Sequence, residues 1–372
     1  MIKVGITGQT GFVGQCLYNT LGLFPSEFCR VEFHRDFFKD EEKLLKFVNN
    51  CDVVVHLAAL NRHADQKIIY ETNISLVGKL NNAFKLSANK PHVIFSSSSQ
   101  EDRDNEYGRS KKEGREIFID SSRNGHIKFT GLVIPNVFGP FGHAYYNSFI
   151  ATFCHQLTHN ETPHIAVDSM VSLIFVADLA QIIIGQIRSC AESEYFEVRA
   201  TDELKVTEVL NKLNYFKNKY FECGIIPELI SRVELNLFNT FRSYIDISTH
   251  FPVKYTKHSD SRGTFVEIIR LSTGGQVSFS TTVPGITRGN HYHTRKIERF
   301  SVIKGKALIQ LRKIGQNKVL EFILTGEEPA YVDMPVWYTH NIKNIGNEEL
   351  FTNFWINEFY NSEDPDTYME IV

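Results

Sequence analysis

The hydrophobic pattern of this chain changes once, near residue 244, and that change limits the folds the chain can adopt. Before it, short apolar runs alternate with helical stretches; after it, short strand-like runs are separated by glycine turns. The first pattern predicts a parallel sheet covered by helices, and the second predicts a small antiparallel barrel or jelly roll. At 372 residues the chain is also too long for one compact core. We therefore expect two domains, residues 1–243 and residues 244–372.

Five apolar runs in the first domain have the length and composition of buried parallel strands. They are residues 2–7, 31–34, 52–57, 92–96 and 127–134. Helical segments, such as residues 66–88 and 105–121, lie between them. This alternation predicts a right-handed, doubly wound α/β sheet of the Rossmann kind.

The first of these runs ends in a glycine turn suited to a dinucleotide. Gly8, Gly11 and Gly14 permit a tight turn, close approach of the backbone to a pyrophosphate and close packing of helix on strand. The helix that follows directs its first amides at the phosphates. An ordinary strand-to-helix turn is the alternative, but the position at the first strand–helix junction favours a cofactor site. The expected contacts are Gly8, Thr10, Gly11, Phe12, Val13 and Gly14.

The end of the second predicted strand bears on the choice of cofactor. An acidic residue there would bind the ribose 2′-hydroxyl of NAD(H), whereas an arginine suits the 2′-phosphate of NADP(H). Arg35 comes before Asp36 in this stretch. We therefore expect NADP(H), with contacts from His34 and Arg35, while Asp36 keeps NAD(H) open. A solvated loop charge is the simpler alternative.

A tyrosine and a lysine stand four residues apart in the helical segment 105–121. Tyr107 and Lys111 thus share one helix face, where the ammonium can lower the pKa of the phenol and bind the cofactor ribose. Four serines, residues 96–99, end the fourth predicted strand just before this helix. Their hydroxyls can bind a carbonyl oxygen, so these residues together predict a site for a carbonyl substrate.

These features resemble the extended short-chain dehydrogenase/reductase family. The shared motifs are the glycine turn, Asp52 with His56-Leu57-Ala58-Ala59, Asn73, the four serines, Tyr107 with Lys111, and Pro135-Asn136-Val137-Phe138-Gly139. The resemblance implies Tyr107 as general acid, Lys111 as its electrostatic partner and Ser98 as the hydroxyl that positions the carbonyl. It places Asn73 in the supporting proton relay. It also implies cofactor contacts from Leu57, Ala58, Ala59, Tyr107 and Lys111.

The sequence departs from the family pattern in places that bear on the reaction. Only eight residues separate Ser98 from Tyr107, so a substrate-side loop is missing, and Val133 stands where many members have arginine. Dehydratases of the family need an Asp-Glu pair beside the catalytic hydroxyl, but Ser98 is followed by Ser-Gln. A 4-ketoreductase, which needs only hydride from the cofactor and a proton from Tyr107, is the economical interpretation.

The stretch 143–148 is rich in aromatic and hydrogen-bonding groups. It lies where a nucleotide-sugar would meet the carboxyl edge of the sheet. We expect substrate contacts from Asn136, His143, Tyr145 and Asn147, with an ordinary loop as the alternative.

The second domain carries histidines in a pattern typical of a metal site. His291 and His293 share one face of a strand, Glu298 begins the next strand, and His340 ends a turn. Both segments resemble the two cupin motifs in full spacing, except that Trp337 replaces the usual glycine. The resemblance implies His291, His293, Glu298 and His340 as ligands. Three imidazoles and a carboxylate favour zinc, while another divalent metal, or a sugar pocket without metal, stays open.

A further resemblance bears on the chemistry of the second domain. The segment Asp260-Ser261-Arg262-Gly263 and the segment Arg288-Gly289-Asn290-His291 look like motifs of nucleotide-sugar 3,5-epimerases, in which the histidine is the base. A histidine that binds a metal cannot hold that role at the same time. Four residues therefore stay candidate bases: Tyr338, Asp260, His258 and an unliganded His291. A simple hairpin start is the alternative for the first segment.

Taken whole, the chain resembles the bifunctional CapF-type enzymes of capsular polysaccharide and O-antigen synthesis, and the likeness extends to residues 145–154 and 364–368. It implies that the cupin epimerises C3 of a UDP-4-keto-6-deoxy-N-acetylhexosamine. The Rossmann domain would then reduce C4 with NADPH to UDP-2-acetamido-2,6-dideoxy-L-talose, a precursor of UDP-N-acetyl-L-fucosamine. Two alternatives remain: a single-activity 4-ketoreductase whose cupin serves binding or dimerisation, and a non-enzymatic cofactor sensor.

Composition limits the partners. The 40 Lys+Arg and 43 Asp+Glu nearly balance, which argues against a nucleic-acid or membrane-surface partner. No apolar run reaches the length of a membrane span, and the chain enters a strand at once, leaving no room for a signal peptide. The six cysteines form no Cys-x-x-Cys pair, which is consistent with a cytoplasmic protein. Members of both parent families self-associate, so we expect a homodimer.

Overall fold

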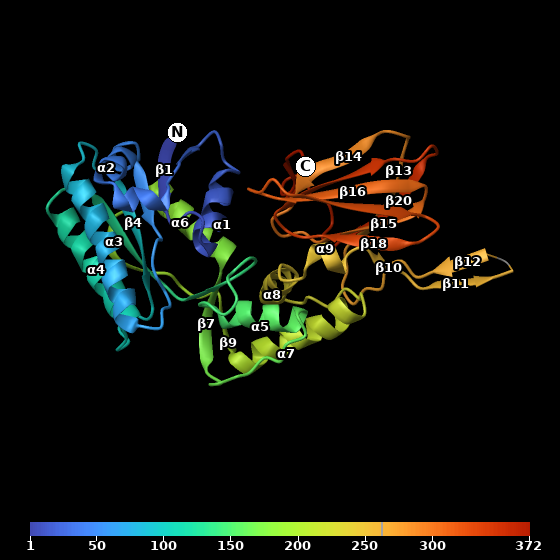
Figure 1. Cartoon of the computed structure of the whole chain (residues 1–372), viewed down its shortest axis with the longest axis horizontal. Coiled ribbons are helices and arrows are strands. Elements are labelled where there is room, and N and C mark those ends of the chain that lie inside the picture. Colours follow the sequence, from blue (N-terminus) through green and yellow to red (C-terminus); the bar gives the residue numbers. More distant parts are fainter. Residues whose placement is uncertain (262) are drawn as a thin grey trace. The chain divides into compact units, whose positions relative to one another are not determined.

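The computed structural model describes residues 1–261 and 263–372, which form two compact units (Figure 1). Unit 1 comprises Met1–Thr152 and Ile165–Glu208, and unit 2 comprises Phe153–His164 and Val209–Val372. The boundary expected between residues 243 and 244 falls inside unit 2, and it stays a prediction. Arg262, in the epimerase-like segment, lies outside the described residues.

Unit 1 is built on a parallel six-stranded sheet in the order β2-β1-β3-β4-β5-β8. The strands are β1 (Ile2–Thr7), β2 (Phe28–Val31), β3 (Val53–His56), β4 (His92–Ser98), β5 (Lys128–Ile134) and β8 (Ser193–Glu197). Residues of the central strands are buried on both faces, which is why their sequences read as unbroken apolar runs. The sheet confirms the predicted doubly wound α/β fold.

Helices cover both faces of this sheet (Figure 1). On one face α1 (Phe12–Leu21) contacts α6 (Val176–Ser189), and their apolar residues form one core cluster with those of β1. On the other face α2 (Glu41–Asn49), α3 (Gln66–Leu86) and α4 (Glu106–Arg123) share a second cluster. A smaller sheet joins β6 (Asn136–Phe138), β7 (Met170–Phe175) and β9 (Asp202–Lys205).

The second strand lies earlier in the chain than the sequence suggested. The prediction of residues 31–34 was wrong, because the ladder with β1 ends where Gly5 pairs with Val31. Phe33 is buried as its apolar side chain requires, but its backbone N–H donates to Gln9 Oε1 at 3.3 Å instead of to a strand. The short 3-10 helix η1 (Arg35–Lys39) follows directly.

Unit 2 combines helices with an antiparallel barrel. Its helical part contains α8 (Arg232–Arg242), α9 (Ile247–His250) and the π-helical turn η2 (Lys217–Glu222), while α5 (Phe149–Thr158) and α7 (Val206–Phe216) begin in unit 1. Across the described residues, no helix has both the length and the apolar character needed to cross a membrane.

The barrel consists of two five-stranded antiparallel sheets, with strand orders β10-β18-β15-β20-β13 and β17-β16-β19-β14-β21. The strands are β10 (Val253–Lys254), β13 (Gln276–Thr282), β14 (Thr287–Tyr292), β15 (Glu298–Lys304), β16 (Lys306–Lys313), β17 (Val319–Thr325), β18 (Ala330–Met334), β19 (Tyr338–Asn344), β20 (Leu350–Ile356) and β21 (Tyr368–Met369). Inward residues of both sheets, among them Val302, Ile309 and Ile342, form one core. The barrel confirms the predicted cupin fold. Strands β11 (Lys257–Asp260) and β12 (Gly263–Val266) form a separate hairpin.

A buried ionic network attaches the helical part of unit 2 to the barrel. Arg299 on β15 and Asp333 on β18 form a two-point ion pair and are almost fully inaccessible. Tyr220 of η2 donates to Asp333 at 2.6 Å, and Arg242 of α8 donates to the Met334 carbonyl at 3.1 Å. These helices therefore depend on barrel residues for the partners of their buried polar groups.

Candidate active sites of the two units

The glycine turn has the tight geometry that the sequence predicted. Gly8 has a φ of +79°, and Gly11 N donates to its carbonyl at 2.9 Å just before α1 begins. A Cβ on Gly14 would lie only 2.1 Å from that carbonyl oxygen, and a Cβ on Gly8 would lie 2.9 Å from Ala58 N. Since no larger side chain fits at either position, glycine is required for the turn from which α1 starts, as in dinucleotide-binding turns.

The residues after β2 leave the choice of cofactor open. His34, Arg35 and Asp36 are all exposed, and their neighbours include Glu32, 3.1 Å from His34, and Lys39, 3.2 Å from Asp36. Exposed charges of this kind suit either a ribose hydroxyl or a phosphate. The preference for NADP(H) over NAD(H) thus stays a prediction.

The structure brings the predicted residues of the carbonyl site together at the junction of β4 and α4. Asn105 caps the helix by accepting from Gly108 N at 2.8 Å, so that α4 starts one residue before Tyr107. Lys111 Nζ is buried, donates to the Ser96 carbonyl at 2.8 Å and lies 5.7 Å from the centre of the Tyr107 ring.

Burial controls the protonation of both side chains. Loss of hydration lowers the pKa of Lys111 to about 8. It raises the pKa of Tyr107 to about 12, although a hydrogen bond with Ser98 acts in the opposite direction. At neutral pH the phenol therefore carries its proton, which is the form that a general acid requires.

Asn73 ties the loop after β3 to the helix of the carbonyl site. Its Nδ2 donates to Ser110 Oγ at 3.0 Å and to the Leu60 carbonyl at 3.1 Å, while its Oδ1 accepts from Leu60 N at 2.7 Å. The loop that carries Leu57, Ala58 and Ala59 is thus held beside α4. The predicted roles of these residues toward the cofactor remain predictions.

A buried carboxylate that the sequence did not single out anchors the short segment before Tyr107. Glu101 accepts from the Ser97 hydroxyl and from Arg115, with an Nη2–Oε1 distance of 2.8 Å and an Nε–Oε2 distance of 3.2 Å. Buried two-point pairs of this kind are geometrically specific. The short segment between Ser98 and Tyr107 is therefore tied to β4 through Ser97 and to α4 through Arg115.

The predicted substrate residues lie on exposed surface near the carboxyl edge of the sheet. Asn136, His143, Tyr145 and Asn147 are all exposed. Two contacts hold this stretch beside the loop after β3: Arg62 Nη1 donates to the Tyr145 carbonyl at 2.8 Å, and Asn61 N donates to Tyr146 Oη at 3.1 Å. This position suits a nucleotide-sugar, but the contacts themselves stay predictions.

The four residues singled out in the barrel converge on one point. Single ligand atoms of His291, His293, Glu298 and His340 all lie within 4.8 Å of one another. Glu298 Oε2 is 3.0 Å from His340 Nε2, 3.1 Å from His293 Nε2 and 3.9 Å from His291 Nε2. His291 on β14 is also the cross-strand partner of His340 on β19.

The electrostatics of this cluster favour a cation. Burial alone would raise the pKa of Glu298, but hydrogen bonds from His293 and His340 hold it well below its usual range. Burial lowers the pKa of His291 to about 4, so that this imidazole is neutral at pH 7. A carboxylate anion surrounded by imidazole nitrogens is a donor set that fits zinc or a similar divalent ion.

Lys313 lies on β16, the strand paired with that of His340, and the sequence analysis missed it. Along β16 the alternating residues Ala307, Ile309 and Leu311 are buried, and Lys313 continues the same face. It pairs across the sheet with Tyr338, two residues before His340. Burial lowers the pKa of Lys313 to about 8 and raises the pKa of Tyr338 above its usual value. The period-two pattern of β16 was the signal that could have identified it.

The other two candidate bases have a different environment. His258 and Asp260 are exposed on β11, in the separate hairpin β11–β12. They do not belong to the two sheets that carry the histidine cluster.

The fold and the two sites define a short-chain dehydrogenase/reductase joined to a cupin barrel. Residues 4–198 match the NAD dependent epimerase/dehydratase family, and residues 258–368 match the polysaccharide biosynthesis C-terminal domain. The chain belongs to the NAD dependent epimerase/dehydratase family and, within it, to the CapF type.

Three relatives illustrate this relationship. The chain is 30% identical to a Pseudomonas aeruginosa protein named UDP-2-acetamido-2,6-beta-L-arabino-hexul-4-ose reductase, over 99% of this chain and 98% of that one. Its sequence is 31% identical to that of the capsular polysaccharide assembling protein CapF from Staphylococcus aureus. The crystal structure of that protein matches this structure with a TM-score of 0.62, and the match covers 100% of both chains. The spore coat polysaccharide biosynthesis protein SpsL of Bacillus subtilis is 26% identical over 30% of this chain and 82% of its own length.

Proposed function

We propose that this chain is a bifunctional nucleotide-sugar enzyme. Its cupin barrel epimerises C3 of a UDP-4-keto-2-acetamido-2,6-dideoxyhexose, and unit 1 then reduces C4 with NADPH. The product is UDP-2-acetamido-2,6-dideoxy-L-talose, a precursor of UDP-N-acetyl-L-fucosamine for capsule or O-antigen. The observation that carries the proposal is the likeness, over 99% of the chain, to a relative named as a reductase of a UDP-linked 4-ulose.

The order of the two steps follows from the chemistry of the sugar. The proton on C3 is acidic only while C4 is a carbonyl, because the carbonyl stabilises the negative charge that its loss creates. Epimerisation must therefore precede reduction. A chain that carries both activities can complete the sequence before the keto sugar is lost.

In unit 1 the residues around α4 deliver the proton for reduction. A bound NADPH would supply the hydride for the new C4–H bond. Ser98 binds the carbonyl oxygen, and Tyr107, whose pKa of about 12 keeps it protonated, donates its proton to that oxygen. Lys111, held by the Ser96 carbonyl at 2.8 Å, offsets the negative charge left on the phenol.

In the barrel the proton transfer at C3 is assigned to Tyr338. Tyr338 shares a face of β19 with the proposed ligand His340 and stands opposite Lys313, whereas the candidates His258 and Asp260 are exposed on a separate hairpin. A divalent ion, proposed to be zinc, would be held by His291, His293, Glu298 and His340 and would supply positive charge that favours loss of the C3 proton. NADP(H) as the preferred cofactor, a homodimer and a cytoplasmic location are parts of the same proposal.

Product analysis by NMR tests the proposal. The full chain is incubated with a UDP-4-keto-6-deoxy-N-acetylhexosamine and NADPH, with metal content measured on the same preparation. A product inverted at C3 and reduced at C4 supports the bifunctional enzyme. A product reduced without inversion identifies a single-activity 4-ketoreductase with a non-catalytic cupin. Absence of NADPH consumption contradicts both.

A further inference from the structure

The last nine residues of unit 2, residues 364–372, contact both strands that carry histidines of the cluster. We call this segment the C-terminal clasp. Its strand β21 pairs with β14, where Met369 stands opposite His291. Glu370 N donates to the Asn290 carbonyl at 2.9 Å, and the Thr339 hydroxyl donates to the Glu370 carbonyl. The clasp thus bridges the neighbours of His291 and His340.

Asp366 of the clasp also determines how the third histidine is oriented. The Nδ1 of His293 is hydrogen-bonded to the Asp366 carbonyl oxygen. Because a carbonyl can only accept, Nδ1 carries a proton, so in the neutral imidazole the lone pair lies on Nε2. That Nε2 lies 3.1 Å from Glu298 Oε2, inside the cluster. The clasp therefore selects the tautomer that can bind a metal.

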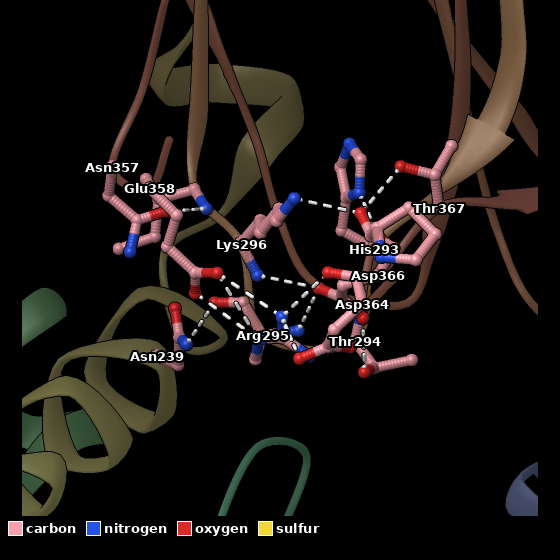
Figure 2. A network of polar contacts seen from close by, with 12 residues as sticks. Asn239, His293, Thr294, Arg295, Lys296, Asn357, Glu358, Asp364, Asp366 and Thr367 are labelled. Atoms are coloured by element: carbon pink, nitrogen blue, oxygen red, sulfur yellow. Dashed lines mark hydrogen bonds and ion pairs between the residues drawn. The ribbon is translucent and has the colours of Figure 1, made fainter. Parts of the chain in front are cut away.

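The Asp366 carboxylate fixes the turn that follows His293 (Figure 2). It accepts from the backbone amides of Thr294, Arg295 and Lys296 at 3.0–3.1 Å, and from the Thr294 hydroxyl at 2.6 Å. Lys296 Nζ adds a bond of 2.8 Å to the Pro365 carbonyl. Asp366 is 2% exposed, and these oriented amides stabilise its negative charge, together with the positive charge of Arg295.

We propose that Asp366 is a positioning residue of the metal centre, and that metal binding and attachment of the clasp are coupled. This inference rests on the proposed metal centre. An attached clasp holds the His293 imidazole in its binding tautomer and fixes the strands of His291 and His340. By linkage, a bound ion must hold the clasp in place with the same coupling free energy. The C-terminus is then a part of the metal site and not merely an end of the chain.

Zinc affinity of the full chain and of two variants tests the first half of the proposal, by competition with a chromophoric chelator. Asp366→Asn keeps the backbone conformation, since asparagine tolerates the φ of +41° found here. Glu328→Gln is the control for the loss of a carboxylate, because Glu328 lies outside the clasp and is exposed, in a pair with Lys254 at 2.8 Å. We expect Asp366→Asn to weaken zinc binding by about 10- to 100-fold and Glu328→Gln to bind like the wild type.

Hydrogen exchange of residues 366–372 tests the second half on the unmodified chain, so that no result depends on the folding of a variant. Zinc is expected to slow exchange of these amides. If the wild type binds zinc, yet Asp366→Asn binds it equally well and exchange of the clasp is unchanged, the coupling is refuted while the metal centre stands. If the wild type binds neither zinc nor another divalent ion, the metal centre and the coupling both fail.

Discussion

The buried pair between Arg299 and Asp333 gives a prediction whose size can be worked from the structure. Asp333 accepts from Arg299 at 2.7 and 2.9 Å and from Tyr220 at 2.6 Å. Burial alone would raise the pKa of Asp333, but the guanidinium holds it below its usual range. In Asp333→Ala, Arg299 keeps its bond to the Gly224 carbonyl but is buried without a counter-ion. Removing one partner of such a pair costs about 3–5 kcal/mol.

For a unit of this size, each kcal/mol lowers the unfolding temperature by roughly 2–4 °C. We therefore expect the transition of unit 2 to fall by roughly 6–20 °C in scanning calorimetry of the full chain. Glu348→Gln is the control, because its pair with Lys304 is more than half exposed and screened by solvent. The double variant Arg299→Met/Asp333→Leu removes both charges and should recover part of the loss. A fall in Asp333→Ala no larger than that in Glu348→Gln would refute the reasoning.

Three further predictions concern unit 1. Because burial lowers the pKa of Lys111 to about 8, a lysine that must be charged loses its proton above that pH. Above pH 8 the kcat/KM for NADPH should thus fall about tenfold per pH unit. Lys111→Arg should move this fall to higher pH, and an unchanged pH profile would exclude Lys111 as the group that titrates. Tyr107→Phe should lower the rate of C4 reduction by about 10²- to 10⁴-fold, measured as NADPH consumption, and a near-normal rate would exclude Tyr107 as the acid. Gly14→Ala, whose Cβ would lie 2.1 Å from the Gly8 carbonyl, should weaken NADPH binding in a fluorescence titration. Gly185→Ala is the control and should bind NADPH normally, because a Cβ there would meet no other part of the chain within 4 Å. Equal binding by both variants would contradict the role of the glycine turn.

Most of the fold could be predicted from local pattern. The strand β1 and the start of α3 lie where expected, because β1 is a short, mostly apolar run that ends at the glycine turn and α3 is amphipathic. The second strand was predicted too late in the chain, because Phe33 is apolar and buried but does not belong to the strand. Periodicity reports which side chains are buried, but it does not report where a backbone amide finds its partner.

The histidine cluster could be predicted because its residues lie in two short segments with recognisable spacing. The role of Asp366 could not be predicted, although the likeness included residues 364–368, because its contact with the turn at Thr294 spans more than seventy residues. The same holds for Arg299 and Asp333, which the sequence analysis did not single out and which the structure buries as a pair. Lys313 could have been predicted in part, because the alternation of buried residues along β16 indicates that its side chain faces inward.

The central claim is that the barrel inverts C3 while unit 1 reduces C4, and exchange at C3 tests it most directly. The Tyr107→Phe variant, which should not reduce the substrate, is incubated in heavy water with the 4-keto sugar and without NADPH. The account predicts that deuterium enters C3, and that a second substitution, His291→Ala, abolishes this incorporation. Incorporation that survives the loss of His291, or no incorporation with either variant, would contradict the assignment of epimerisation to the metal centre of the barrel.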